Sequence, residues 1–486
     1  MTTMHVAAPL VILLALAYSG TADARAPKVV QARRADTPAP FLRLAAPLAS
    51  EAAVLKRDTE ERTPNIGFPR ALPGLADDGL PMRLQWSELG NGSRVAHFAI
   101  SSSGAAALRV GLDPRALPLQ ALLRFHDGAG RAIEVTGESI LESIADNLEA
   151  REHGMNARTW WSPVVESSTA VVEIELPAGV QPEQVRLGVP KISHLVASAK
   201  NGFATRKEAS CSLDAKCHEG AWSAEMNAEA RMLFTRDGVT YACSGTLLAD
   251  HDPATEIPYF HTAGHCISGQ ADASTVVTYW FYRSAECNGS PGRYEVVNGG
   301  AQLLFAHPET DTVLLRLNQP APRGATYLGW SANASFAEGT PVTGVHHGGA
   351  EMQKISFGNI AGFASCMRGG EMCRRSSGAE SSHYHVTWRA GTTLAGGSGS
   401  PLIADGTREL IGHLSSGMSA CGATDAGDFY GRFDLAYRAG LHRWLGTKPA
   451  ARITPTPVPV PPPPVVAGPR LRLTTTLSSV PRLAYR

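Results

Sequence analysis

The stretch with the clearest chemical potential is the loop at residues 394–402, which reads Leu-Ala-Gly-Gly-Ser-Gly-Ser-Pro-Leu. It places Ser398 between glycines and shortly before a proline. Glycine accepts positive φ and lets a carbonyl group approach main-chain N–H groups closely, so a hydroxyl on such a turn is a candidate nucleophile. Gly/Ser loops are more often simple connections, and the loop alone is therefore weak evidence.

Two further residues upstream supply the partners that a nucleophilic serine needs. The segment Tyr259–Cys266, reading Tyr-Phe-His-Thr-Ala-Gly-His-Cys, contains His265, and Asp311 stands at the head of an apolar strand. Taken singly, these are better explained as a core histidine and a turn aspartate. The order His265, Asp311, Ser398, with gaps of 46 and 87 residues, matches the chain order of chymotrypsin-like peptidases. Together the three residues predict acyl transfer by an activated serine.

The cysteines indicate disulfide bonds rather than a metal or redox site. All eight lie in one part of the chain, at positions 211, 217, 243, 266, 287, 366, 373 and 421. An even number confined to one segment of an exported chain is typical of disulfides, whose pairing the sequence alone does not fix. There is no Cys-x-x-Cys pair, and neither His346-His347 nor His261-x3-His265 has a His-Glu-x-x-His arrangement. We therefore expect no metal and no cofactor.

Charge and hydropathy bear on location and partners. The 44 basic and 44 acidic residues balance, which gives no electrostatic basis for binding nucleic acid or an anionic membrane. The apolar run Val6–Tyr18 is too short to span a bilayer comfortably and is followed by small residues. This pattern predicts a signal peptide at residues 1–24 and secretion, through the periplasm. We separately expect the protein to be a monomer.

The N-terminal half is predicted to contain a linker and a strand-rich domain. Residues 25–79 are rich in Arg, Ala, Pro and Glu without sustained periodicity, and are expected to be a flexible linker. Residues 80–200 contain short strands between turns. In Ala170–Leu176 the apolar residues alternate with Glu173 and Glu175, as in a half-buried strand. A β-sandwich-like prosegment domain is the resulting prediction.

The C-terminal half is expected to be a second all-β domain. Between residues 208 and 447, strand-like runs alternate with turns, and only Phe433–Leu445 has helical spacing. After it, residues 448–486 form a proline-rich spacer and a short tail.

Several blocks of this second half together resemble one known family. They are Cys211-x5-Cys217, Cys243-Ser-Gly-Thr-Leu, Thr262-Ala-Gly-His-Cys266, His346-His347 followed by Lys354-Ile-Ser356, Gly396-Gly-Ser-Gly-Ser-Pro401 and Asp428-Phe-Tyr-Gly-Arg432. In this order they are similar to the secreted bacterial lysyl endopeptidases, which are trypsin-like serine peptidases. The resemblance implies two β-barrels and a C-terminal helix.

The resemblance also implies the role of each site residue. Ser398 would attack the scissile carbonyl, His265 would take and return its proton, and Asp311 would orient the imidazole. The N–H groups of Gly396 and Ser398 would hold the oxyanion. Asp428 would lie at the bottom of the specificity pocket and select Lys, and with it Arg, because an uncharged side chain would leave the acid buried and unpaired.

The chain departs from its relatives at a few positions. Ser415 stands where the family usually has a histidine, and Thr392 stands where animal trypsins have their specificity aspartate. Residue 397, an aspartate in animal trypsins, is Gly, so the trypsin activation switch cannot operate. Latency must then come from the N-terminal region covering the cleft. Maturation is expected near Lys200 or Lys207.

The family's disulfides would pair Cys211–Cys421, Cys217–Cys287 and Cys243–Cys266, leaving Cys366–Cys373 as an additional local bridge. Two alternatives to a lysyl endopeptidase stay open at this point. One is a non-catalytic relative that binds peptides through the same fold, and the other is a serine peptidase with a different preference at the cleaved bond.

Overall fold

The computed structural model describes most of the chain between residues 26 and 447. The described ranges are 26–32, 41–57, 63–199, 210–333, 336–367, 370, 372–378, 381–423 and 426–447. The chain divides into a compact unit spanning residues 1–455 and a second unit spanning 456–486, and all described residues belong to the first. The predicted signal peptide, the maturation sites and the proline-rich tail lie outside the described residues.

The N-terminal domain is built from two sheets that face each other across an apolar core. One sheet runs in the order β1-β8-β7-β10-β5-β2, with β4 beside β5. Its strands are β1 (Lys28–Gln31), β2 (Phe41–Leu44), β4 (Ser87–Glu88), β5 (Arg94–Ser102), β7 (Leu122–His126), β8 (Arg131–Thr136) and β10 (Thr169–Leu176). The facing strands are β3 (Asn65–Ala71), β6 (Ala107–Ala116), β9 (Trp160–Trp161) and β11 (Arg186–Leu195). The predicted sandwich-like fold is thus confirmed, and its strands extend beyond the predicted bounds of 80–200.

Strand β10 is more buried than its alternating pattern predicts. Val172, Ile174 and Leu176 are fully buried as predicted, but Glu173 is also 0% exposed and Glu175 is 7% exposed. Arg124 on the neighbouring strand β7 forms ion pairs with both glutamates, which offsets the cost of burying them. Helix α3 (Gly137–Glu149) was not predicted from the sequence. The Thr136 hydroxyl caps its first turn by accepting a hydrogen bond from the Ser139 N–H.

The predicted linker is wrong where the structure describes it. Strands β1 and β2, helix α1 (Ala49–Arg57) and strand β3 all lie within residues 25–79. In β3, Ile66 and Phe68 are 4% and 1% exposed and alternate as strand residues do. The neighbouring residues Gly67 and Pro69 conceal this alternation in the sequence, because glycine and proline are both rare inside strands.

The C-terminal half forms two barrels, as expected. The first contains β13 (Glu229–Arg236), β14 (Val239–Leu248), β15 (Tyr259–Ala263), β16 (Val277–Trp280), β17 (Glu295–Val297), β18 (Ala301–His307) and β19 (Thr312–Leu317). The second contains β12 (Leu213–Asp214), β20 (Pro341–His346), β21 (Lys354–Cys366), β22 (Cys373–Ser376), β23 (His383–Ala390), β24 (Pro401–Ala404), β25 (Glu409–Gly417) and β26 (Asp428–Arg432). Each encloses its own apolar cluster, and a third cluster joins the two.

Short helices flank the barrels. They are α5 (Glu219–Ala228), α6 (Gln270–Ala273) and a C-terminal segment of α7 (Phe433–Ala436), the π-helical turn η8 (Tyr437–Leu441) and α8 (His442–Leu445). The predicted single helix at 433–445 is therefore interrupted, and the backbone leaves helical geometry at Gly440. Phe433 and Leu441 are nevertheless buried in the cluster between the barrels. Among the described residues, no helix is long and apolar enough to cross a membrane.

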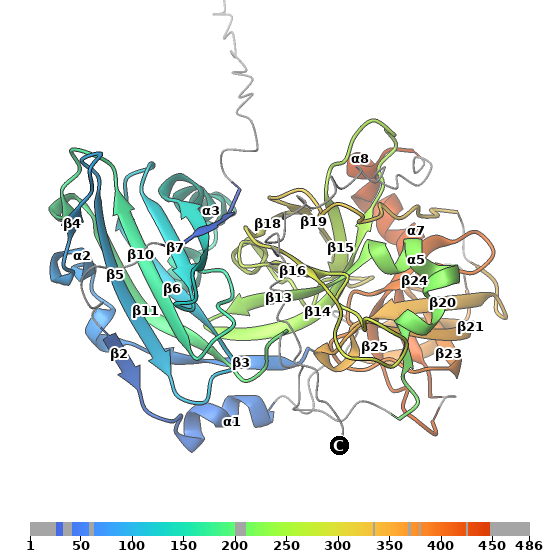
Figure 1. The fold of residues 1–486 in the computed structure, drawn as a ribbon. Coiled ribbons are helices and arrows are strands. Elements are labelled where there is room, and N and C mark those ends of the chain that lie inside the picture. Colours follow the sequence, from blue (N-terminus) through green and yellow to red (C-terminus); the bar gives the residue numbers. More distant parts are fainter. Residues whose placement is uncertain are drawn as a thin grey trace, which may run out of the picture. The chain divides into compact units, whose positions relative to one another are not determined.

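Strand β3 joins the N-terminal domain to the first barrel (Figure 1). It pairs antiparallel with β11 of its own domain and with β14 of the barrel, so one continuous sheet passes through both. Ile66 and Leu195 share an apolar cluster with Leu233, Ala242 and other residues of the barrel. The two regions therefore have a common core.

Replacing Ile66 with Ala should weaken this common core. Removing a buried isoleucine side chain costs about 2–5 kcal/mol, and the loss should lower the unfolding midpoint of the N-terminal domain and the first barrel together. Chemical denaturation followed by tryptophan fluorescence measures it. Val29→Ala, at a position 71% exposed, is the matched control. Independent unfolding of the two regions in the Ile66 variant would contradict a common core.

Candidate active site

His265 and Asp311 meet because of the register between two strands. Strands β15 and β19 pair antiparallel, with Ala263 opposite Thr312. His265 follows the end of one strand and Asp311 precedes the start of the other. The Nδ1 of His265 lies 2.6 Å from Asp311 Oδ2, and the His265 main-chain N–H donates to Oδ1 at 2.8 Å. The carboxylate therefore fixes both the ring and the backbone of the histidine.

Asp311 is itself held by a dense set of donors. Its backbone has φ of 55°, an uncommon conformation for a residue other than glycine. Its carbonyl accepts from Gly264 N–H at 2.6 Å and bonds His413 Nε2 at 2.8 Å, and its Oδ2 accepts from the Ser415 hydroxyl at 2.7 Å. Burial opposes ionisation, but His265 and the Ser415 hydroxyl outweigh it and hold the pKa of Asp311 well below its usual range.

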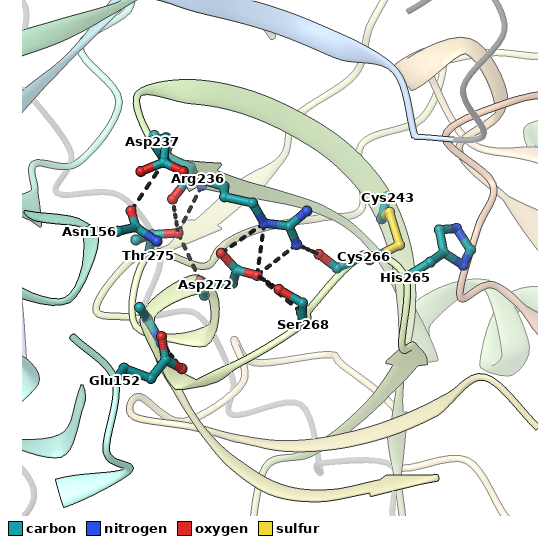
Figure 2. A network of polar contacts seen from close by, with 12 residues as sticks. Glu152, Asn156, Arg236, Asp237, Cys243, His265, Cys266, Ser268, Asp272 and Thr275 are labelled. Atoms are coloured by element: carbon teal, nitrogen blue, oxygen red, sulfur yellow. Dashed lines mark hydrogen bonds and ion pairs between the residues drawn. A yellow bond between two sulfur atoms is a disulfide. The ribbon is translucent and has the colours of Figure 1, made fainter. Parts of the chain in front are cut away.

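The segment after His265 is anchored from behind. Cys266 is bonded to Cys243, and its carbonyl accepts a hydrogen bond from Arg236 at 2.9 Å. Arg236 also pairs with Asp272, which in turn accepts from the Ser268 main-chain N–H at 3.0 Å. Figure 2 shows the ring of His265 on the far side of the disulfide, directed away from this network. These contacts therefore fix the backbone that follows His265 and leave the nitrogens of its imidazole ring free of this network.

The loop around Ser398 leaves two main-chain donors free. Gly397, Gly399 and Ser400 donate their N–H groups to carbonyls of the loop and of β25. Among the described residues, no acceptor faces the N–H of Gly396 or of Ser398. Gly396 has φ of +98°, which few residues other than glycine adopt. These are the two donors that the sequence predicted for the oxyanion.

The same loop is packed against the strands that carry His265. The Ser398 carbonyl accepts from Ser244 N–H of β14 at 2.8 Å. A Cβ on Gly399 would lie 2.2 Å from Thr262 Oγ1 on β15, so only glycine allows this approach. Ser398 is 4% exposed. The loop is thus brought beside the end of β15, where the segment with His265 begins.

The His265 ring keeps one nitrogen unused. Its Nε2 is buried and has no hydrogen-bond partner among the described residues. It therefore makes no hydrogen bond to Ser398. Catalytic hydrogen bonds are often long in structures without substrate and tighten when it binds. The geometry joins His265 to Asp311 directly, and it relates Ser398 to them through the packing of its loop.

Asp428 opens strand β26 and is 0% exposed. Its Oδ2 accepts hydrogen bonds from Trp388 Nε1 at 2.6 Å, from Thr393 Oγ1 at 2.6 Å and from Ser419 Oγ at 2.8 Å. Burial raises the pKa of the carboxyl, although these hydrogen bonds oppose the shift. No Lys or Arg of the described residues forms an ion pair with it. The site is therefore a buried acid that lacks a cation.

Space beside Asp428 depends on Gly417. A Cβ at this position would lie 1.9 Å from Asp428 Oδ1, far inside van der Waals contact. Gly417 lies at the end of β25 and pairs with Asp428 across the sheet. The glycine therefore keeps the carboxylate in place.

The disulfides are Cys211–Cys421, Cys217–Cys287, Cys243–Cys266 and Cys366–Cys373. The first three are the pairs that the resemblance implied, and the fourth is the additional local bridge expected from the two remaining cysteines. No cysteine of the chain is free.

Several site residues were not found from the sequence. Ser415 was noted only as a departure, yet its hydroxyl bonds the acid of the pair. His413 and two of the three donors around Asp428, Trp388 and Ser419, gave no signal in the sequence. One clue was available, because Thr393 lies five residues before Ser398 and next to the position where trypsins carry their specificity acid.

The two barrels, the His265–Asp311 pair and the glycine-rich serine loop define a class, the two-barrel serine endopeptidases. Comparison with known proteins identifies the family within this class. Residues 42–196 match the family model "Lysyl endopeptidase N-terminal domain", and residues 205–431 match "Lysyl endopeptidase, C-terminal domain". The chain belongs to the lysyl endopeptidase family, and it is a serine endopeptidase.

A lysyl endopeptidase from Pseudomonas aeruginosa is 34% identical over 379 residues, covering 73% of this chain and 76% of that protein. Similar solved structures are more distant. The HtrA-type protease AlgW with tripeptide has 21% identity and a TM-score of 0.31, covering 46% of this chain and 62%, less than two thirds, of that one. The active form of the Rv3671c protease from M. tuberculosis has 15% identity and a TM-score of 0.31, with 49% and 91% covered.

Replacing Gly417 with Ala should displace the Asp428 carboxylate. We expect kcat/KM for a lysyl peptide to fall by about tenfold or more, which corresponds to at least about 1.4 kcal/mol, while a fluorophosphonate still labels the protein. Gly406→Ala is the matched control, because a Cβ there meets nothing within 4 Å. Equal kinetics in the two variants would show that Gly417 does not shape the pocket.

Proposed function

We propose that this protein is a secreted endopeptidase that cleaves peptide bonds after Lys, and after Arg, through His265, Asp311 and Ser398. The observation that carries the proposal is the state of the His265 ring. Its Nδ1 is bonded to an ionised, buried carboxylate, and its Nε2 is left unpaired beside the serine loop. A base oriented in this way is what a serine nucleophile requires.

In the first half of the reaction, Ser398 Oγ attacks the carbonyl carbon of the scissile bond, and its proton passes to His265 Nε2. The imidazolium that forms is stabilised by Asp311, which stays ionised because its pKa is low. The negative charge on the former carbonyl oxygen is accepted by the N–H groups of Gly396 and Ser398. Losing one such donor typically costs about 10²–10³ in rate.

Collapse of this intermediate breaks the C–N bond, and His265 gives its proton to the departing amine. The acyl group remains on Ser398 Oγ. Water then enters, gives a proton to His265 and attacks the ester carbon through the same oxyanion contacts. The second collapse returns the proton to Ser398 and releases the new carboxyl terminus.

Specificity is assigned to Asp428. A buried carboxylate without a cation is costly, and a lysine side chain entering the pocket would supply the missing charge. An apolar side chain would leave the acid unpaired, which is the basis for rejecting it. Arginine carries the same charge and is the second substrate class that this carboxylate accepts.

The other candidate that an observation favours keeps the serine mechanism but has no strict cationic preference. The Asp428 carboxylate already accepts hydrogen bonds from three side chains and one main-chain N–H. These hydrogen bonds already stabilise the carboxylate, so its burial costs less without a cation. The residues preferred before the cleaved bond distinguish the two candidates.

Secretion and maturation complete the proposal. The predicted signal peptide would direct a precursor out of the cytoplasm, and a cut after Lys200 or Lys207 would sever the N-terminal domain, including its strands before residue 80, from the peptidase domain at 208–447. Cuts after lysine suit self-processing by an enzyme with this preference.

The Ser398→Ala variant should lose fluorophosphonate labelling and accumulate as an unprocessed precursor. Loss of the nucleophile lowers kcat by about 10⁶-fold in well-studied serine peptidases. Ser400→Ala, two residues along the same loop, is the matched control and should still be labelled. Normal maturation of Ser398→Ala in a host without similar proteases would contradict self-processing.

The Asp428→Asn variant keeps the shape of the pocket and removes its charge. Cleavage after Lys in a peptide library should fall by about 10²-fold or more, since a desolvated charge pair contributes several kcal/mol. Labelling of Ser398 by a fluorophosphonate should persist. An unchanged profile of residues before the cleaved bond would remove Asp428 from the pocket and favour the second candidate.

A further inference from the structure

A cavity of about 720 Å³ lies between the N-terminal domain and the first barrel. Arg109, Asp146 and Trp161 line it from the N-terminal domain, and Thr275 and Gln302 line it from the barrel. None of the active-site residues described above lines it. Pockets that bind small molecules typically measure about 300–1,000 Å³. The cavity is therefore large enough for a small organic ligand and is separate from the active site.

Arg109 on strand β6 is a buried cation that lacks an acid. It is 2% exposed, and it donates from Nε to the Ser162 carbonyl at 2.9 Å and from Nη1 to Thr235 Oγ1 at 2.8 Å. Among the described residues, no carboxylate forms an ion pair with it and no acceptor faces its Nη2. Burial lowers the pKa of Arg109 to about 10, and only Tyr279 opposes the shift, so the side chain stays charged at neutral pH. A desolvated charge of this kind is costly unless an anion joins it.

Trp161 supplies a second unused donor on the same face of the sheet. It stands opposite Gly111 in the ladder between β6 and β9, and a Cβ on Gly111 would lie 3.2 Å from its ring. Arg109 and Gly111 are two residues apart on one strand, so their side-chain positions share a face. The Trp161 Nε1 is buried and has no partner among the described residues. Two unused donors on one wall of the cavity suit the oxygens of a carboxylate.

Asp146 of helix α3 supplies the opposite charge. Its side chain is half-buried, and no cation of the described residues forms an ion pair with it. Burial raises the pKa of the Asp146 carboxyl, although Gln302 and Arg316 oppose the shift. Arg109 is not among the groups that shift this pKa, and the two residues form no ion pair. The cavity thus presents a cation and an acid that do not neutralise each other.

We propose that this cavity binds an amino acid or a short peptide with both ends free, its carboxylate on Arg109 and Trp161 and its ammonium group on Asp146. The half-buried ring of Trp160, which packs against Phe125 with centroids 5.7 Å apart, offers apolar surface to the rest of the ligand. A purely anionic ligand would leave Asp146 unpaired, and a purely cationic one would leave Arg109 unpaired. Peptides with two free ends are what an endopeptidase releases, so ligands of this class form wherever the enzyme acts.

The test uses the full chain with Ser398→Ala, which keeps both walls of the cavity in one chain and avoids cleavage. The probe is the tripeptide Gly-Gly-Phe, compared with its N-acetyl form and its C-terminal amide, each of which lacks one charge. Gly-Gly-Phe at millimolar concentration should raise the unfolding midpoint by about 2 °C or more. By isothermal titration calorimetry, each modified form should bind about tenfold more weakly or worse, because it leaves one charge of the cavity unpaired.

Variants in the same background assign each charge of the probe to its residue. Arg109→Met should bind Gly-Gly-Phe about tenfold more weakly and no longer distinguish it from the amide. Asp146→Asn should no longer distinguish it from the N-acetyl form. Arg115→Met, on the same strand as Arg109 but with a side chain 56% exposed, is the matched control and should bind as its parent does.

Thermal unfolding without peptide establishes that each variant is folded. If Arg109→Met does not fold, Trp161→Phe removes the unused N–H, keeps an aromatic ring and should weaken binding by about threefold or more. Equal affinity for the three forms of the probe would overturn the inference, as would an amide still distinguished by Arg109→Met or no binding at millimolar peptide. Because none of these measurements needs catalysis, they give the same answer whether or not the proposed cleavage after lysine is correct.

Discussion

The carboxylate of Asp311 is the interaction on which the site depends. An ionised group at 2% exposure is costly unless donors surround it. Here the donors come from both barrels, since His265 follows β15 of the first while Ser415 lies on β25 of the second. The acid therefore ties the two barrels together at the point where the histidine must be oriented. Its unusual positive φ is held by two hydrogen bonds to its own carbonyl.

Strand β14 connects this centre to the rest of the chain. On one edge it contacts β15, the loop of Ser398 and β3 in succession, so this loop and the N-terminal domain share a single strand. Because β3 also pairs with β11, the sheet of the N-terminal domain is continuous with the barrel. The chain lacks the carboxylate at residue 397 that switches animal trypsins. The structure instead joins the N-terminal domain to the first barrel through a shared sheet.

The outline of the fold was accessible from the sequence because strand alternation, turn residues and the cysteine pattern are local signals. The all-β character and the sandwich-like domain followed from them, whereas the two barrels were implied by the resemblance to a known family. Strand β3 was missed because Gly67 and Pro69 weaken its pattern, and its stability comes from pairing on both edges rather than from propensity. The interruption of the C-terminal helix at Gly440 was also not predicted, because the effect of a glycine on a helix depends on the packing around it.

By itself the sequence determined the chemical types and their order: an imidazole, a carboxylate, a glycine-flanked hydroxyl and a second acid. Only the tertiary structure decided how they are used. Register between β15 and β19 joins His265 to Asp311, and burial without an ion pair turns Asp428 into a candidate for binding a cation. Ser415 and His413 acquire their roles only from residues distant in the chain, because hydrogen bonds and steric contacts depend on distances in space that no local pattern encodes.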